Sequence, residues 1–147
     1  MENISGQGLR VTLRASRTFP VGISLSQFAD DADSLDTPSV QIADKAMGLN
    51  GDLVIWGTNS PLLLTLNVIP NTDDDSNLGL LFEANRVSKG KVPAQDTITI
   101  IVQYPNGKTK TFARGACTDF VPTTGVASAG RLKTRPFSFA FENMVET

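Results

Sequence analysis

Apolar and polar residues alternate with a period of two along much of the chain. The stretches Leu9–Arg14 and Phe137–Glu142 are the clearest examples. Such alternation is typical of a strand with one buried face. We predict eight strands, at residues 9–14, 21–26, 40–47, 53–58, 62–68, 97–104, 108–116 and 135–142. The chain is therefore predicted to be mostly β.

Two Asn-Gly pairs separate neighbouring predicted strands. Asn50-Gly51 lies between strands 40–47 and 53–58, and Asn106-Gly107 lies between strands 97–104 and 108–116. Asparagine and glycine accept the positive φ angles that a type I′ turn requires. We predict two tight hairpins with this type of turn.

One segment departs from the period of two. Leu78, Leu81 and Phe82 have the spacing of a single stripe on a helix. Thr72 is a suitable N-cap, and the acidic residues after it favour the positive end of the helix dipole. Gly90 is placed to end the helix. We predict one helix at about residues 74–88.

Two further segments are predicted to be loops. Residues 28–37 are polar and acidic and precede Pro38, which gives an extended loop at about residues 27–38. Residues 121–133 are rich in small and polar side chains. Because neither segment marks a boundary between domains, we predict a single domain over residues 1–147.

Histidine is absent from the chain, and Cys117 is its one cysteine. Histidine is the most common acid–base group at neutral pH, and zinc sites need clusters of cysteine and histidine. We therefore predict no enzymatic activity, no metal site and no cofactor. A lone cysteine also suits a reducing compartment.

The charge and hydropathy of the chain limit its partners. The formal net charge is −2 and no basic patch is evident, which argues against strong binding to nucleic acid. The N-terminal residues lack the basic-then-apolar pattern of a signal peptide. Apolar runs such as Pro61–Leu64 are far too short to span a membrane, so we expect no membrane insertion.

Two acidic clusters invite comparison with cation sites. The first begins the predicted helix at Asp73–Asp75, and we interpret it as helix N-terminal charge because the spacing of a calcium-binding loop is missing. The second lies in the predicted loop, and we interpret it as solvated or as facing a basic surface on another copy. It consists of Asp30, Asp31, Asp33 and Asp36.

Three aromatic or sulfur-containing features are interpreted as packing residues. Cys117 is predicted to be a small core or half-buried residue rather than a reactive thiol. Trp56 ends the apolar run Leu53–Trp56, which predicts a place in the core or in a subunit interface. The phenylalanine stripe of the last strand alternates with serine, alanine and glutamate, so we predict core packing rather than base stacking. The stripe comprises Phe137, Phe139 and Phe141.

Basic residues on the polar sides of the predicted strands leave two interpretations open. Either they are ordinary exposed charges, or they contact the acidic loop of another copy. These residues are Arg10, Arg14, Arg17, Lys108, Lys110 and Arg114.

The order of features along the chain carries a family resemblance. A Leu-rich strand ends in Val68-Ile69-Pro70 and is followed by an acidic turn and one helix. A hairpin then contains Asp96–Ile100 and Asn106-Gly107, and the chain closes with the aromatic strand at 135–142. This layout covers most of the chain and resembles the tail tube subunit of a contractile-tailed bacteriophage.

The resemblance implies an antiparallel β-barrel or sandwich with one flanking helix. It also implies hexameric rings that stack into a hollow tube, which conducts DNA during infection. The implied partners are other copies of the chain, a sheath protein outside the tube, the tape-measure protein and genomic DNA in the lumen, and baseplate and terminator proteins at its ends. The implied location is the virion tail, assembled in the host cytoplasm.

The acidic loop is the expected contact between rings. Ring closure pairs sheet edges that would otherwise be exposed. In the loop, apolar side chains are expected to anchor on the next ring while charges set the register. The candidate contact residues are Phe28, Asp30, Asp31, Asp33, Leu35, Asp36, Arg10, Arg14 and Arg17.

Other functions of the same sequence stay open. A baseplate or tube-tip protein, or the tube of a contractile injection or secretion system, would share this layout. A monomeric β-barrel that binds a small ligand is the alternative from another class, and it predicts a concave apolar pocket.

Overall fold

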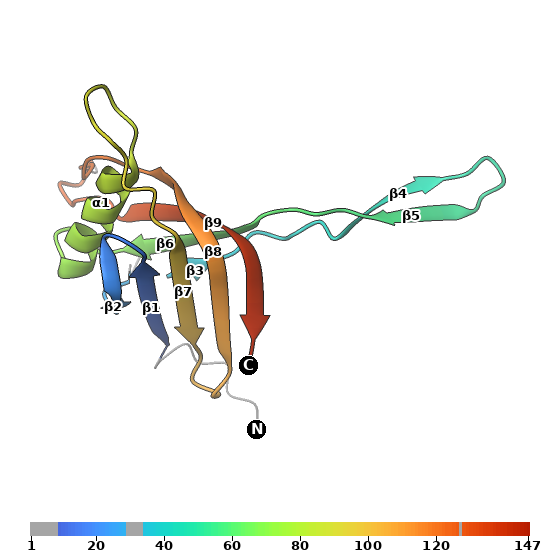
Figure 1. Cartoon of the computed structure of the whole chain (residues 1–147), viewed down its shortest axis with the longest axis horizontal. Coiled ribbons are helices and arrows are strands. Elements are labelled where there is room, and N and C mark those ends of the chain that lie inside the picture. Colours follow the sequence, from blue (N-terminus) through green and yellow to red (C-terminus); the bar gives the residue numbers. More distant parts are fainter. Residues whose placement is uncertain (1–8, 29–33, 127) are drawn as a thin grey trace.

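The computed structural model describes residues 9–28, 34–126 and 128–147. Within these ranges the chain forms nine strands and one helix (Figure 1). They are β1 (Arg10–Ala15), β2 (Phe19–Leu25), β3 (Leu35–Asp36), β4 (Ala43–Met47), β5 (Leu53–Gly57), β6 (Leu62–Val68), α1 (Asp73–Asn85), β7 (Ile98–Gln103), β8 (Thr109–Phe120) and β9 (Arg135–Glu146).

Seven strands form one antiparallel sheet in the order β2-β1-β7-β8-β9-β6-β3. The sheet curls into a half-barrel, and α1 lies against its concave side (Figure 1). The predicted fold class, a mostly β antiparallel barrel or sandwich with one flanking helix, is confirmed. No helix in the described ranges is long and apolar enough to cross a membrane.

The centre of the core lies between β6, β9 and α1. Leu64 of β6 lies opposite Phe139 of β9, and both side chains are fully buried. Leu66 and Phe137 form the next buried pair. The ring of Phe82 on α1 lies 5.1 Å from that of Phe137 and 5.0 Å from that of Phe139. The predicted core packing of the aromatic stripe is therefore confirmed.

Helix α1 begins where the sequence predicts and ends three residues earlier. The Thr72 hydroxyl accepts a hydrogen bond from the Asp75 amide, as expected of an N-cap. The helix ends at Asn85, and Arg86 is already extended. The Asn85 side chain donates to the Leu81 carbonyl and to Asp96, which satisfies the last turn locally. Gly90 consequently has no part in ending the helix.

The acidic start of α1 anchors the helix to the sheet. The Asp74 carboxylate accepts hydrogen bonds of 2.7 Å from the amides of both Ser26 and Gln27, just after β2. The Asp75 carboxylate forms a buried ion pair of 3.0 Å with Arg135 at the start of β9. Two of the three helix carboxylates are thus structural anchors, and no group of metal-binding side chains occurs in the described ranges.

Both Asn-Gly hairpins occur at the predicted positions, but their turn type differs from the prediction. In the first, the Gly107 amide bonds to the Tyr104 carbonyl, and only Gly107 has a positive φ, of 89°. The centre of the turn is Pro105-Asn106, and proline cannot adopt the positive φ that a type I′ turn would need there. The arm hairpin has the same bonding, from the Gly51 amide to the Gly48 carbonyl.

The predicted loop at 27–38 is partly structured. Phe28 bridges to Val68, and Leu35–Asp36 form the short strand β3 along the edge of β6. The segment that extends away from the body comes later, at residues 37–61, and contains the two-stranded sheet β4–β5 (Figure 1). We call residues 37–61 the arm.

Candidate assembly surfaces

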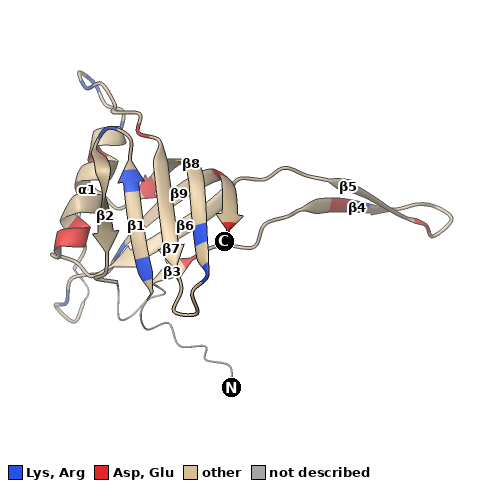
Figure 2. Cartoon of the chain, turned by 60° about the horizontal axis from the view of Figure 1, so that its bottom comes forward, with Lys and Arg blue, Asp and Glu red and all other residues tan. Residues whose placement is uncertain are grey.

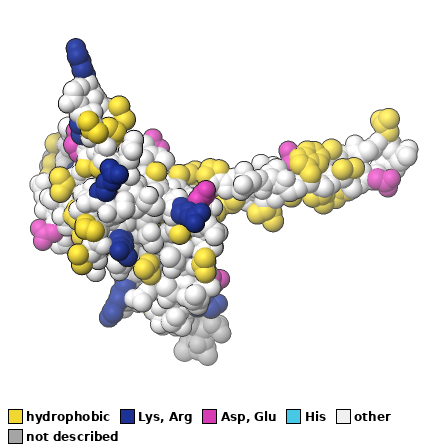
Figure 3. Space-filling model, viewed as in Figure 1, with side chains coloured by type: hydrophobic (Ala, Val, Ile, Leu, Met, Phe, Trp, Pro, Cys, Tyr) yellow, Lys and Arg dark blue, Asp and Glu magenta, His cyan; other side chains and the backbone are white. Residues whose placement is uncertain are grey.

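The arm is the least buried part of the described structure. No residue between 37 and 61 is buried, and every residue of β5 is exposed. Its apolar side chains lie along the outer half of the arm (Figure 3). They include Ile42, Met47, Leu49, Leu53, Val54, Ile55 and Trp56. Exposed apolar patches of this kind mark interaction surfaces.

The pairing of β4 with β5 divides these side chains between two faces. Lys45 lies opposite Ile55, and Met47 lies opposite Leu53. Asp44 lies opposite Trp56, and Ala46 lies opposite Val54. Because successive side chains of a strand point to opposite faces, these pairs define two surfaces. We call the first the lysine face (Ala43, Lys45, Met47, Leu53 and Ile55) and the second the aspartate face (Ile42, Asp44, Ala46, Val54 and Trp56).

Trp56 does not lie in the core of the chain. Its side chain is 47% exposed on the arm, which rules out the core half of the sequence-based interpretation. A subunit interface for Trp56 stays a prediction. The signal in the sequence was the unbroken run Leu53–Trp56, since strands with one buried face alternate and strands covered on both faces do not.

The outer strands of the main sheet leave two edges without a strand partner in the described chain. One edge is β3, which is only two residues long. The other is β2, where the register with β1 shifts and Gly22 has φ of 95°. This bulge turns Val21 to solvent, at 96% exposure, although the alternation had placed it on the buried face.

The face of the sheet that points away from α1 carries many small polar side chains. Thr12 lies opposite Ile101, which in turn lies opposite Thr111. Thr65 and Ser138 also pair across strands, with their hydroxyl oxygens 3.2 Å apart. We call this the polar face of the sheet.

The candidate basic residues do not gather in one cluster. Arg10 and Arg14 are exposed on β1 and belong to the polar face (Figure 2). Arg17 lies in the following turn, where its amide donates to Asp96. Arg114 has φ of 56° and lies 3.9 Å from Glu142 in an exposed ion pair.

The two lysines of the basic set lie on the hairpin of β7 and β8. The Lys110 ammonium is 6.0 Å from the ring centre of Tyr104. The Lys108 amide donates to the Asn106 side chain in the turn. Contacts of these six basic residues with another copy stay a prediction.

The predicted loop residues are only partly described. Phe28 and Leu35 are half-buried and pack against the core of their own chain. Asp36 is exposed at the end of β3. Asp30, Asp31 and Asp33 lie outside the described residues.

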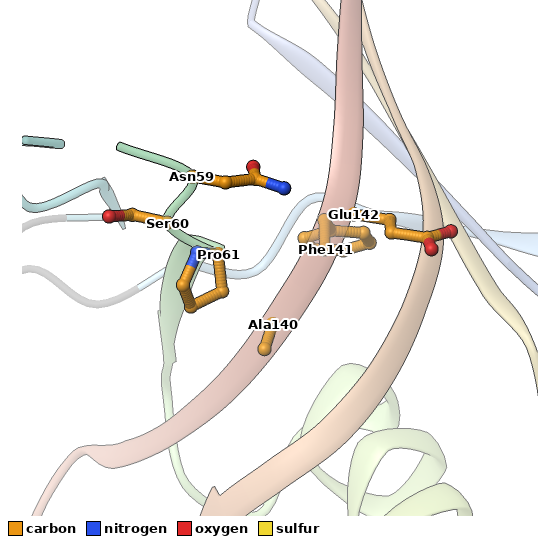
Figure 4. Close-up of a pocket in the computed structure, with 6 residues that line it drawn as sticks. All are labelled: Asn59, Ser60, Pro61, Ala140, Phe141 and Glu142. Carbon is orange, nitrogen blue, oxygen red and sulfur yellow. The ribbon is translucent and has the colours of Figure 1, made fainter. Parts of the chain in front are cut away.

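Two open hollows lie where the arm joins the body. The first has a volume of about 380 Å³ and is lined by Asn59, Ser60 and Pro61 of the arm and by Ala140, Phe141 and Glu142 of β9 (Figure 4). The second, of about 190 Å³, has walls of Leu63, Phe112 and Met144 with Tyr104 and Lys110 at its rim, beside the arm residues Thr37, Pro38 and Val40. We call them the glutamate hollow and the lysine hollow.

The titratable groups of the body act in packing. Burial, with a smaller effect of the Asp96 carboxylate, raises the pKa of the Cys117 thiol to about 12. The thiolate is therefore scarce at neutral pH, in agreement with the predicted half-buried packing role.

Asp96, which the sequence did not single out, fixes the turn between β1 and β2. Its carboxylate accepts hydrogen bonds from the amides of Arg17 and Thr18, at 2.7 and 3.0 Å, and from the side chains of Thr18 and Asn85. Burial opposes its ionisation most strongly, but these hydrogen bonds together hold the pKa of Asp96 below its ordinary value.

The fold is similar to solved components of contractile injection systems. A chain from the PVC sheath/tube terminator in the extended state covers 100% of this chain and 98% of its own length, with a TM-score of 0.59 and 11% identity. A chain from the baseplate of the anti-feeding prophage covers 100% and 96%, with a TM-score of 0.60 and 9% identity. A chain from the PVC sheath–tube complex covers 99% and 93%, with a TM-score of 0.56 and 12% identity.

Sequence comparison adds a family. No curated protein matches the chain significantly. The family model described as tail fiber protein gp32 matches residues 2–145. Since this is almost the whole chain, the protein belongs to the tail fiber protein gp32 family.

Proposed function

We propose that this chain is the structural subunit of a phage tail tube, in which hexameric rings stack into a hollow channel that conducts DNA. In this proposal the chain has no catalytic role and needs no cofactor. A sheath protein surrounds the tube, the tape-measure protein and DNA occupy its lumen, and baseplate and terminator proteins close its ends. The subunit is assembled in the host cytoplasm and resides in the virion tail.

The exposed arm is the observation that carries this proposal. An isolated two-stranded hairpin is marginally stable at best in water, yet β4–β5 projects from the body with its apolar side chains exposed. Such a surface gains most of its stabilisation when a partner covers it. In a closed ring or a stacked tube, every copy offers both an arm and a surface that receives one.

The sheet edges support the same assembly. Exposed strand edges present unpaired amides and carbonyls to other chains. The edges β2 and β3 lie at opposite ends of the seven-strand order, so a head-to-tail ring brings each against a neighbour. Ring formation would extend the half-barrel into a larger closed barrel.

The polar face of the sheet suits the lumen. Threonine and serine side chains are neutral, and neutral walls release few counterions when DNA passes. Arg10 and Arg14 are the charged exceptions on β1. We propose that these two, together with Arg17, meet the acidic loop of a neighbouring copy, which would neutralise them.

A ring at the end of the tube is the second candidate function. It is favoured by the similarity of the fold to chains in a sheath/tube terminator, a baseplate and a tube-terminating cap. A terminator or baseplate protein of this kind would form single rings, whereas a tube subunit would form long stacks. The two candidates therefore differ in the length of the assembly.

Electron microscopy and light scattering of the purified chain test the proposal. Hollow tubes of many rings are expected, isolated rings would favour the terminator, and a monomer at high concentration would contradict both. A variant with residues 39–59 replaced by a short Gly-Ser linker is expected to fold but stay monomeric, because the replaced residues contribute nothing buried to the body. If that variant still forms normal tubes, the arm does not carry assembly.

The monomeric ligand-binding module is tested by the same measurements. The interior of the half-barrel is filled by buried leucine, isoleucine, valine and phenylalanine side chains, and the hollows at the arm are open. A concentration-independent monomer would favour that alternative.

A further inference from the structure

The arm carries apolar side chains on both of its faces. On the lysine face, Met47, Leu53 and Ile55 are exposed, the last by 61%. On the aspartate face, Val54 and Trp56 are exposed by 52% and 47%. The two faces of this ribbon therefore present comparable apolar surfaces.

A single partner surface covers only one face of a two-stranded ribbon. Unbroken apolar runs are typical of strands covered on both faces, and Leu53–Trp56 is such a run. Nothing in the described chain buries either face, since no residue of the arm is buried. Burial of both faces consequently requires two surfaces from outside the chain.

The two faces differ in charge. Lys45 lies among the apolar residues of one face, and Asp44 lies beside Trp56 on the other. A surface that is complementary to one sign is unfavourable for the other, so the faces select different partners. The body offers hollows of both signs near the base of the arm.

The glutamate hollow fits the lysine face. Glu142 lines it, and the ion pair of Glu142 with Arg114 is long, at 3.9 Å, with both side chains largely exposed. The lysine hollow fits the aspartate face, because it combines apolar walls with Lys110 and the ring of Tyr104. An aromatic side chain such as Trp56 gains from both the apolar walls and a nearby ammonium.

We propose that each arm is clamped between two other copies of the chain. The lysine face docks at the glutamate hollow of one copy, and the aspartate face docks at the lysine hollow of another. This arrangement rests on the proposed assembly of copies and adds that each arm ties three subunits together. An arm of this kind links lateral and stacking contacts in one element.

Cysteine protection tests whether both faces are covered. Val54→Cys and Ile55→Cys are matched variants, since the residues are adjacent, similarly exposed and on opposite faces. The native Cys117, half-buried and with a raised pKa, gives a low background that the unsubstituted protein measures. Both introduced thiols are expected to react with a maleimide in the monomer and to lose most of this reaction on assembly. If one stays as reactive in the assembly as in the monomer, the clamp is wrong.

Crosslinking identifies the copies that are contacted. A photoreactive phenylalanine analogue replaces Ile55 or Trp56, and unlabelled and ¹⁵N-labelled chains are mixed before assembly. Position 55 is expected to link to the peptides around Ser60 and Glu142, and position 56 to those around Lys110 and Met144, in both cases between differently labelled chains. Links from both positions to the same peptide, or only within one chain, overturn the clamp.

The outcome separates this inference from the proposed function. Tubes or rings with only one protected face retain the assembly role and reject the clamp. An unsubstituted chain that stays monomeric rejects both.

Discussion

Strands β5 and β6 follow each other in the chain and are both rich in large apolar residues, yet they meet opposite fates. In β6, Leu64, Leu66 and Val68 are fully buried. In β5, Leu53, Val54 and Ile55 are all more than half exposed. The difference lies in their patterns, because β6 alternates and β5 does not. Alternation marks burial against the chain's own core, whereas the unbroken run marks burial that only an assembly can supply.

The energetic consequence is that folding and assembly draw on different residues. Burying a large apolar side chain stabilises by about 1.5 to 3 kcal/mol. In the body this stabilisation is realised when one chain folds, through contacts such as those of Phe82 with β9. In the arm it is deferred until other copies arrive. Substitutions in the two regions should therefore separate stability from assembly.

The largest expected effect is that of Phe139→Ala in the body. Phe139 is fully buried between Leu64 and the ring of Phe82, so its truncation leaves a cavity. We expect a loss of about 3 to 5 kcal/mol in the free energy of unfolding, measured by urea denaturation. Leu63→Ala is the control, because Leu63 is 42% exposed on the same strand pair and should cost about 1 kcal/mol or less. Equal losses would contradict the assignment of faces.

The ion pair that fixes α1 to β9 comes next. Asp75→Asn leaves the Arg135 guanidinium buried without its anion, although its bond to the Val121 carbonyl remains. We expect a loss of about 3 kcal/mol in unfolding free energy, by the same denaturation measurement. The double variant Asp75→Leu with Arg135→Met should recover much of it, since an apolar pair avoids the desolvation of two charges. A silent single variant would mean that the pair does not hold the helix.

The sequence predicted the body better than the arm, and the reasons are physical. Alternation at Leu64 and Phe139 reports which face is buried, and Thr72 reports the start of the helix through its own hydroxyl. The end of the helix depends instead on a bond from Asn85 to Asp96, eleven residues away, which a local pattern does not contain. The bulge that exposes Val21 is likewise set by pairing with β1.

The assembly surface was only partly accessible to sequence reasoning. The hairpin of residues 40–58 was predicted at its correct place, but its projection was not, because periodicity does not say whether a covering surface lies in the same chain. The acidic loop attracted attention through its charge, while Phe28 and Leu35 turned out to pack on their own core. An apolar run without alternation, Leu53–Trp56, was the better indicator of an interface.

An intermediate effect is expected for Asp96→Asn, which weakens the turn of the body. Losing charged hydrogen bonds to Thr18 and Arg17 should cost about 1 to 3 kcal/mol. Because the folded state lowers the pKa of Asp96, its stabilisation is fully present above the ordinary value of 3.8 and is lost as the pH falls through the lower folded pKa. Unfolding measured from pH 7 downward should show this acid loss in the native chain and less of it in the variant. Asp52→Asn, in the exposed turn of the arm, is the control and should leave the acid profile unchanged.

The smallest effect on stability, with the clearest effect on assembly, is expected for Trp56→Ala. Truncating a 47% exposed side chain on the arm should change the unfolding free energy of the monomer by no more than about 0.5 kcal/mol. Large aromatic side chains often dominate interfaces, so the same variant should lose most of its assembled fraction in sedimentation, while Trp56→Phe should retain more. Since Trp56 is the one tryptophan, the emission of the native chain should also shift to shorter wavelength on assembly. Phe139→Ala and Trp56→Ala thus remove one aromatic ring from each region, and the division between body and arm holds only if the first lowers the stability of the monomer while the second lowers assembly alone.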